Sequence, residues 1–110
     1  LTGQFAMLIM PMLDKIGVRP RHGAFILWAS ANELFDVRTY RKAMRLPDTD
    51  ESFSTYIKWA IKRKFAELVV QKMHLKRYSL TYEGKQFAKG MTEFLKKKTV
   101  VRTIQKKDAD

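Results

Sequence analysis

Basic side chains recur through residues 52–64 in a pattern that could bind phosphate groups. Lys58, Lys62, Arg63 and Lys64 fall mostly off an apolar stripe, whose spacing of three and four residues predicts one amphipathic helix. The stripe consists of Phe53, Ile57, Ala60, Ile61, Phe65 and Leu68. The chemistry open to lysine and arginine in such a row is electrostatic attraction and hydrogen bonding to an anionic polymer.

A second basic cluster follows the helix, at residues 72–76 (KMHLK), and is expected to form the tip of a hairpin. Val69–Val70 and Arg77–Thr81 on either side are β-prone and read as two short strands. A helix is narrow enough for the major groove of a nucleic-acid duplex, and a hairpin can lie along the backbone or the minor groove. This part of the chain therefore predicts contact with a duplex.

Other kinds of site are not indicated by the sequence. The chain has no cysteine, which excludes disulfides, thiol catalysis and cysteine-based zinc sites. His22 and His74 are far apart in the sequence, so we expect surface or phosphate-contacting roles for them rather than metal binding. No glycine-rich phosphate loop or nucleophile–base pair is present, and helix capping accounts for the acidic cluster Asp48, Asp50 and Glu51. We therefore predict no enzymatic activity, no cofactor and no metal.

The composition describes one folded, strongly basic domain. The 110 residues are 45% hydrophobic, and 22 lysines and arginines against 11 acidic residues give a net charge of +11. Such a surface suits DNA, RNA or an anionic membrane. A membrane-surface role is disfavoured because the basic residues are spread over several elements rather than along one helix. No apolar run approaches the ~20 residues that span a bilayer.

The absence of cysteine is typical of a cytoplasmic protein, and with a polyanion as partner we expect a cytoplasmic, nucleoid-associated location. The sequence begins at Leu1 rather than at methionine, so we expect further residues upstream in the full protein. No internal repeat or low-complexity segment is present, which agrees with a single domain.

The N-terminal segment 2–16 predicts a helix that is apolar on nearly all sides. Its apolar residues are Phe5, Ala6, Met7, Leu8, Ile9, Met10, Met12, Leu13 and Ile16. A helix of this kind must be covered on every side, and a domain of this length rarely covers a terminal helix completely. A partner subunit is the expected cover, which predicts a homodimer; the alternative is an N-terminal core helix. Pro11 should kink this helix or mark one of its ends.

Two more helices are expected in the first half of the chain. Residues 17–23, punctuated by glycine and proline, read as a connection. Residues 24–34 read as the central core helix, in which Trp28 packs. Residues 35–37 are β-prone, and residues 38–46 should form the next helix.

A tight turn over residues 46–51 separates this helix from the basic one. Pro47 ends the first helix, and Asp48 with Glu51 three residues on predicts a capping box that opens the second. Two helices flanking a tight turn make a helix-turn-helix arrangement.

A last helix is expected to begin at Tyr82 and to bury a stripe formed by Phe87, Met91, Phe94 and Leu95. Residues 99–104 could be more helix or a strand, and residues 106–110 should be a frayed tail. The expected organisation is one domain over residues 1–110: an N-terminal helix (1–16), a helix-turn-helix with its hairpin (23–81) and a C-terminal helix (82–105).

This order of elements resembles the winged helix-turn-helix domain of MarR- and PadR-type regulators, a mainly α fold with a small β-hairpin wing. The segment 77–84 (RYSLTYEG) is similar to the R-Y-x-L-T-x-x-G that closes the wing in those families. The resemblance covers roughly residues 23–95 and implies that Leu80 fills the core, Thr81 caps the last helix and Gly84 allows close packing. Two features differ from the family pattern: residues 67–70 contain no glycine, and the wing is short without an Asp/Arg-rich tip.

The resemblance implies sequence-specific binding of double-stranded DNA by a homodimer, with the recognition helix in the major groove. The expected base-facing residues are Ser52, Ser54, Thr55 and Lys58. The expected phosphate contacts are Arg38, Arg41, Lys42, Lys62 and Arg63. The expected wing contacts are Lys72, His74, Lys76 and Arg77. The biological setting could be transcription regulation, plasmid or phage partition or replication, or conjugation.

A winged-helix module that binds RNA or a protein partner is the alternative. RNA readers display aromatic side chains for stacking on unpaired bases, and Tyr56 and Trp59 could serve. At helical spacing these two residues are more often partly buried. Equal binding to duplex DNA, RNA and heparin would favour this class.

Overall fold

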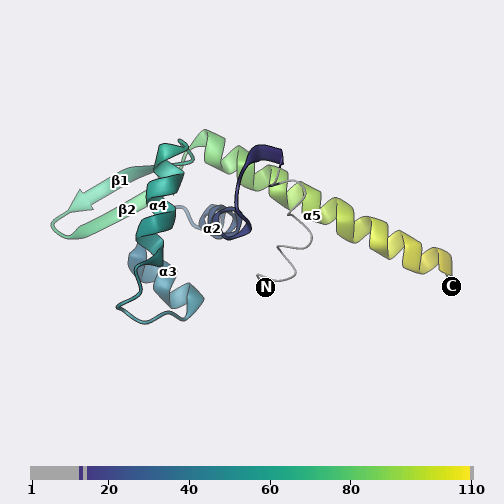
Figure 1. The fold of residues 1–110 in the computed structure, drawn as a ribbon, viewed down its shortest axis with the longest axis horizontal. Coiled ribbons are helices and arrows are strands. Elements are labelled where there is room, and N and C mark those ends of the chain that lie inside the picture. The colour runs from purple at the N-terminus through teal and green to yellow at the C-terminus, as the bar shows by residue number, and fades with distance from the viewer. Residues whose placement is uncertain (1–12, 14, 110) are drawn as a thin grey trace.

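The computed structural model describes residue 13 and residues 15–109, with side chains to Lys96, so most of the predicted helix 2–16 lies outside the described residues. Of that segment, Leu13, Lys15 and Ile16 are helical. The elements that follow are α2 (Pro20–Ser30), α3 (Val37–Met44), α4 (Ser52–Lys62), β1 (Ala66–Lys72), β2 (Leu75–Leu80) and α5 (Tyr82–Ala109). The predicted fold class, mainly α with one β-hairpin, is confirmed. The hairpin and the far end of α5 extend to opposite sides of the molecule (Figure 1).

The helix α2 begins four residues before the predicted start at Ala24 and ends at Ser30 rather than Leu34. Pro20 stands at the start of the helix, where its missing N–H would be unpaired in any case. The prediction that residues 20–23 belong to a connection is therefore wrong. Asn32 lies just beyond this end, and its side-chain amide donates to the carbonyl oxygen of Trp28 at 3.1 Å.

The core is built around α2, and Phe25 is its centre. The Phe25 ring lies 5.5–6.1 Å, between centroids, from five other aromatic rings, which are Trp28, Phe35, Tyr40, Phe53 and Tyr56. These rings come from α2, α3, α4 and the bridge residue between α2 and α3. The aromatic cluster thus fixes the two helices of the helix-turn-helix against one support, and the predicted packing role of Trp28 is confirmed.

Both helices of the helix-turn-helix end in the same way, with a basic residue in the left-handed conformation. Arg45 has φ 55° after α3, and Lys64 has φ 63° after α4. Past α4, the amide of Phe65 donates to the Ala60 oxygen (2.8 Å) and that of Lys64 to the Ile61 oxygen (2.9 Å), the bonding of a Schellman motif. Glycine is the usual residue at this position, and Lys64 occupies it here.

This helix end corrects the predicted apolar stripe. The stripe holds through Phe53, Ile57 and Ala60, which are buried, but Ile61 and Leu68 are 43% and 44% exposed. Residues beyond Lys62 no longer share a helical face, because the helix ends there, the chain turns at Lys64 and it continues as a strand.

The hairpin is an antiparallel pair whose register runs from Ala66↔Leu80 at its base to Lys72↔Leu75 at its tip. A bulge between Leu68 and Val70 interrupts the ladder. Phe35 pairs with Tyr78 on the other edge of β2, through N–O bonds of 2.8 and 2.9 Å. The β-prone residues before α3 therefore tie the helix-turn-helix to the wing.

The junction between β2 and α5 matches the roles implied by the RYSLTYEG segment. Leu80 is buried, and the Thr81 hydroxyl accepts a hydrogen bond from the amide of Gly84 at 3.1 Å. Gly84 lies so close to Phe65 that an added Cβ would be 2.0 Å from the Phe65 oxygen.

The last helix continues to Ala109, so residues 99–104 are helical and the predicted frayed tail over 106–109 is wrong. Of its predicted stripe, Met91 is fully buried, while Phe87, Phe94 and Leu95 are partly buried against the core.

Candidate nucleic-acid interface

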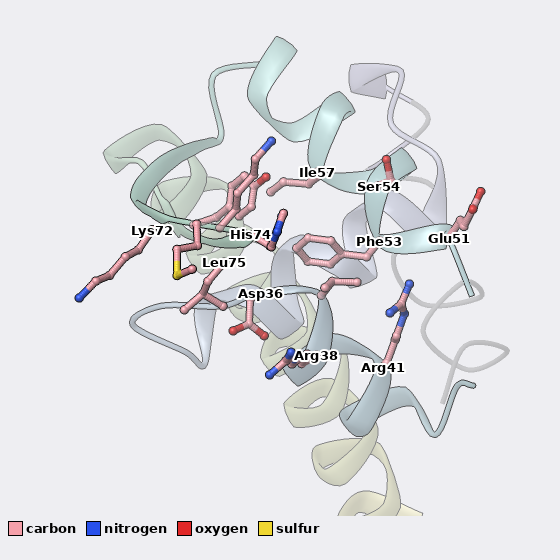
Figure 2. Close-up of a pocket in the computed structure, with 14 residues that line it drawn as sticks. Asp36, Arg38, Arg41, Glu51, Phe53, Ser54, Ile57, Lys72, His74 and Leu75 are labelled. Carbon is pink, nitrogen blue, oxygen red and sulfur yellow. The ribbon is translucent and has the colours of Figure 1, made fainter. Parts of the chain in front are cut away.

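A groove of about 820 Å³ lies where α3, the first half of α4 and the wing tip meet. Figure 2 shows Arg38 and Arg41 on one side of it and Lys72 and His74 across from them. The lining residues are Asp36, Val37, Arg38, Arg41, Glu51, Phe53, Ser54, Ile57, Lys72, Met73, His74, Leu75, Lys76 and Tyr78. Six of the predicted contact residues, Arg38, Arg41, Ser54, Lys72, His74 and Lys76, are thus brought together from three elements.

The inner side of the groove is apolar and holds α4 against the wing. Phe53 and Ile57 are 4% and 5% exposed, and the Phe53 ring lies 5.9 Å from that of Tyr78 on β2. This contact sets the separation between α4 and the wing, and hence the width of the groove.

The outward face of α4 carries most of the residues predicted to face bases. Ser54, Thr55 and Lys58 are exposed, as are Lys62 and Arg63 further along. Ser52 differs, because its hydroxyl and its backbone amide both donate to the carboxylate of Asp50. The Ser52 hydroxyl is therefore engaged in stabilising the start of the helix.

The start of α4 differs from the predicted capping box. Neither Asp48 nor Glu51 caps the helix; Glu51 occupies the N-cap position without a side-chain hydrogen bond. Asp50 provides the carboxylate instead, and the bonds from the Ser52 hydroxyl and amide lower the pKa of the Asp50 carboxyl. A capping box is present at α3, where Asp36 accepts from the Thr39 amide at 2.8 Å and Thr39 accepts from the Asp36 amide at 3.0 Å.

Two arginines among the predicted contacts also have internal partners. The Arg41 guanidinium donates to the Asp50 carbonyl oxygen from Nε at 2.9 Å and from Nη2 at 2.5 Å, which ties α3 to the turn before α4. Arg77 Nε lies 3.9 Å from Asp36 Oδ2, with its side chain 47% exposed. Arg41 therefore holds the turn in place beside the groove, and Arg77 lies within ion-pair distance of Asp36. Lys42 lies exposed on α3, outside the groove lining.

His22 is not the surface residue that the sequence indicated. Its ring packs edge-on against Trp59 at 4.7 Å and Tyr56 at 5.1 Å, both on α4. Burial lowers the pKa of His22, and the nearby charge of Arg19 lowers it further. Tyr56 and Trp59 are partly buried, as predicted, and their packing against His22 occupies ring surface that the RNA alternative would need.

Asp36 is the site residue that sequence reasoning missed. It is 8% exposed, lines the groove, caps α3 and faces Arg77. The signal was present as an aspartate three residues before Thr39, directly after an apolar β-prone residue.

Within the described residues, no three histidine or acidic side chains are grouped so that they could hold a metal ion. In that same part of the chain, no helix combines the length and the apolar character needed to cross a membrane.

The comparisons with known proteins reveal similarity in structure alone. No family model matches the sequence, and no curated protein matches it either. Among solved structures, the chain is similar to MepR, which has a winged-helix fold, in the crystal structure of a mutant form from a multidrug resistant S. aureus clinical isolate. The TM-score is 0.72 at 14% identity, over 93% of this chain and 78% of that chain. This confirms the winged-helix fold that the sequence resemblance implied.

Proposed function

We propose that this protein binds double-stranded DNA in a sequence-specific way and regulates transcription. In this proposal α4 enters the major groove with Ser54, Thr55 and Lys58 toward the bases. The wing lies on the adjacent backbone or minor groove. The observation that carries the proposal is the groove between them, which has cations on both of its sides.

The groove suits a phosphodiester strand because its charges come from opposite directions. Arg38 comes from α3, while Lys72 and Lys76 come from the wing, and all three line the groove. The two acidic lining residues have other partners or lie at the edge. Asp36 is engaged with Thr39 and Arg77, and Glu51 is exposed at the start of α4. A strand lying there would place a base edge next to the outward face of α4.

Charge outside the groove favours the same partner. Lys58, Lys62 and Arg63 follow one another along the exposed side of α4 and just past its end, and the chain carries a net charge of +11. A protein that neutralises about six phosphates should lose affinity with salt at a log–log slope of about −5.

Assembly as a homodimer on a two-fold site is part of the proposal. It rests on the apolar segment 2–16, which needs a cover that a domain of this length rarely supplies. Regulation of transcription is favoured over plasmid partition, replication or conjugation because the order of elements and the segment 77–84 (RYSLTYEG) resemble those of MarR- and PadR-type regulators.

The test is selection of bound sequences from a random duplex pool, followed by anisotropy titrations. The selected duplex, a scrambled duplex, an RNA hairpin and heparin would be compared at fixed salt. We expect a two-fold-symmetric motif and a preference of about 10³ or more for the selected duplex over the scrambled one. Equal binding to duplex, RNA and heparin would contradict the proposal and favour an RNA- or protein-binding module.

A further inference from the structure

The wing ends in a methionine that the rest of the domain leaves uncovered. Met73 is 89% exposed, more than any other large hydrophobic residue described. Single exposed apolar residues are common on protein surfaces, so exposure alone assigns no role. The position of Met73 at the tip, and the charges beside it, carry the argument.

The hairpin carries this side chain to the tip of the wing. The ladder continues from Ala66↔Leu80 to Lys72↔Leu75, and Met73 follows as the first of two turn residues. At about 3.3 Å per residue, the six steps along β1 put the tip roughly 20 Å from the base of the wing. Figure 1 shows the hairpin projecting beyond α4, with its turn as the outermost part.

The residues next to Met73 along the wing tip carry positive or neutral side chains. Lys72, His74 and Lys76 are all exposed, and residues 72–77 contain no acidic side chain. These groups would draw the tip toward phosphates on both edges of a narrow groove. The Met73 thioether between them is apolar and cannot bind a phosphate.

The backbone at the tip is one that glycine usually adopts. Met73 has φ 57°, and His74 has no positive φ, which is the φ pattern of a type II′ turn. Glycine is the favoured first residue of that turn. A Met73→Gly variant should therefore keep the hairpin and remove only the side chain.

We propose that Met73 is an apolar wedge that enters the minor groove, partly separates two stacked base pairs and kinks the duplex. Architectural proteins use methionine and other apolar side chains in this way. The wedge would favour flexible pyrimidine–purine steps, since those unstack most easily. This inference rests on the proposed duplex binding and adds a specificity-determining residue that reads deformability rather than base edges.

The experiment uses the full chain and its selected duplex, with donor and acceptor dyes at the two ends to report bending by energy transfer. A second set of duplexes carries 2-aminopurine at successive steps under the wing, where unstacking raises fluorescence. The variants are Met73→Gly, Met73→Leu, which keeps the apolar volume, and Val69→Ala, a control at another exposed apolar residue of the wing.

We expect the unaltered protein, Met73→Leu and Val69→Ala to bend the duplex. Met73→Gly should bind about tenfold more weakly and bend it less. Its salt slope should be unchanged, because no cation has been removed.

Two results would overturn the wedge while leaving duplex binding in place. One is Met73→Gly bending the duplex as much as the unaltered protein. The other is the absence of any 2-aminopurine signal with the unaltered protein, a measurement that needs no variant. Failure of the unaltered protein to bind any duplex would overturn both the wedge and the proposed function.

Discussion

The close contact between Gly84 and Phe65 makes Gly84→Ala a sharp test of how the wing is joined to the last helix. An added Cβ would lie 2.0 Å from the Phe65 oxygen and 2.9 Å from its carbonyl carbon. Real Cβ atoms essentially never come within 3.0 Å of such atoms. The two backbones must therefore separate by about 1 Å, which is the minimum that this spacing allows.

The separation would break hydrogen bonds that close the junction. Thr81 donates its amide to the Phe65 oxygen at 2.9 Å and its hydroxyl to the Lys64 oxygen at 2.6 Å. Losing both costs about 1–3 kcal/mol, and overpacking costs about 1–3 kcal/mol more. The higher helix propensity of alanine offsets up to about 1 kcal/mol of this loss. Together these contributions allow a fall of about 1–6 kcal/mol in the free energy of unfolding, and we expect a value near the middle of that range, about 2–4 kcal/mol.

The assay is urea and thermal unfolding followed by far-ultraviolet circular dichroism, at one fixed protein concentration. The melting temperature should fall by about 10–20 °C. Gly23→Ala is the matched control, since Gly23 is also buried near the start of a helix. Its added Cβ would meet only the ends of two flexible side chains, Leu13 Cδ1 at 3.0 Å and Met91 Sδ at 3.3 Å, so we expect a change within about 1 kcal/mol. Equal stability of the two variants would refute the contact.

Four further outcomes are expected. Lys64→Gly should raise the free energy of unfolding by about 1 kcal/mol, because it removes the strain of a residue with a side chain in the left-handed conformation. Urea unfolding checks this, and a loss of stability would count against the Schellman geometry. Asp36→Ala should lower it by about 1–2 kcal/mol through loss of the α3 cap, measured in the same way. The pKa of His22 is lowered on folding, so the stability contributed by its neutral ring is complete above about pH 6.5 and is lost as pH falls below that value. Between pH 7.5 and pH 5.5, the melting temperature should fall more for the parent protein than for the His22→Phe variant. Light scattering at about tens of micromolar should give the mass of a dimer, and a clean monomer would contradict the assembly.

The parts of the fold that the sequence predicted are those where residue type and local conformation agree. Leu80, Thr81 and Gly84 each do what their chemistry favours: an apolar side chain in the core, a hydroxyl at a helix start, and no side chain at a close crossing. The order of helices and strands followed from periodicity, which changes from the helical to the strand pattern in the second half of residues 52–84, although the sequence put the change at Val69 and the structure begins β1 at Ala66.

The errors arose where the tertiary structure overrides a local signal. Lys64 ends α4 in a conformation that lysine rarely adopts, so nothing in the sequence marked the stop, and the apolar stripe was extended to Leu68. Pro20 suits both a loop and the first turn of a helix, and only packing decides between them. Asp48, Asp50 and Glu51 all offer a carboxylate near the same helix start, and the position of Ser52 selects Asp50.

The groove itself could not be read from the sequence. Residues 36–41, 51–57 and 72–78 are brought together by the aromatic cluster around Phe25 and by the bridge between Phe35 and Tyr78. The internal bonds of Arg41 and Arg77 were likewise hidden, because their partners are a backbone oxygen and an N-cap carboxylate.

The central claim is that α4 reads bases while the wing holds the backbone of a duplex. The measurement is the affinity of Thr55→Ala, Lys58→Ala, Lys76→Ala and Arg77→Ala for the selected and the scrambled duplex across a salt series. We predict that the two α4 variants lose about 1–3 kcal/mol of discrimination. The two wing variants should weaken both duplexes about equally, and each should reduce the salt slope by about one unit. If the wing variants lose discrimination while the α4 variants keep it, the assignment of α4 as the reading helix is wrong.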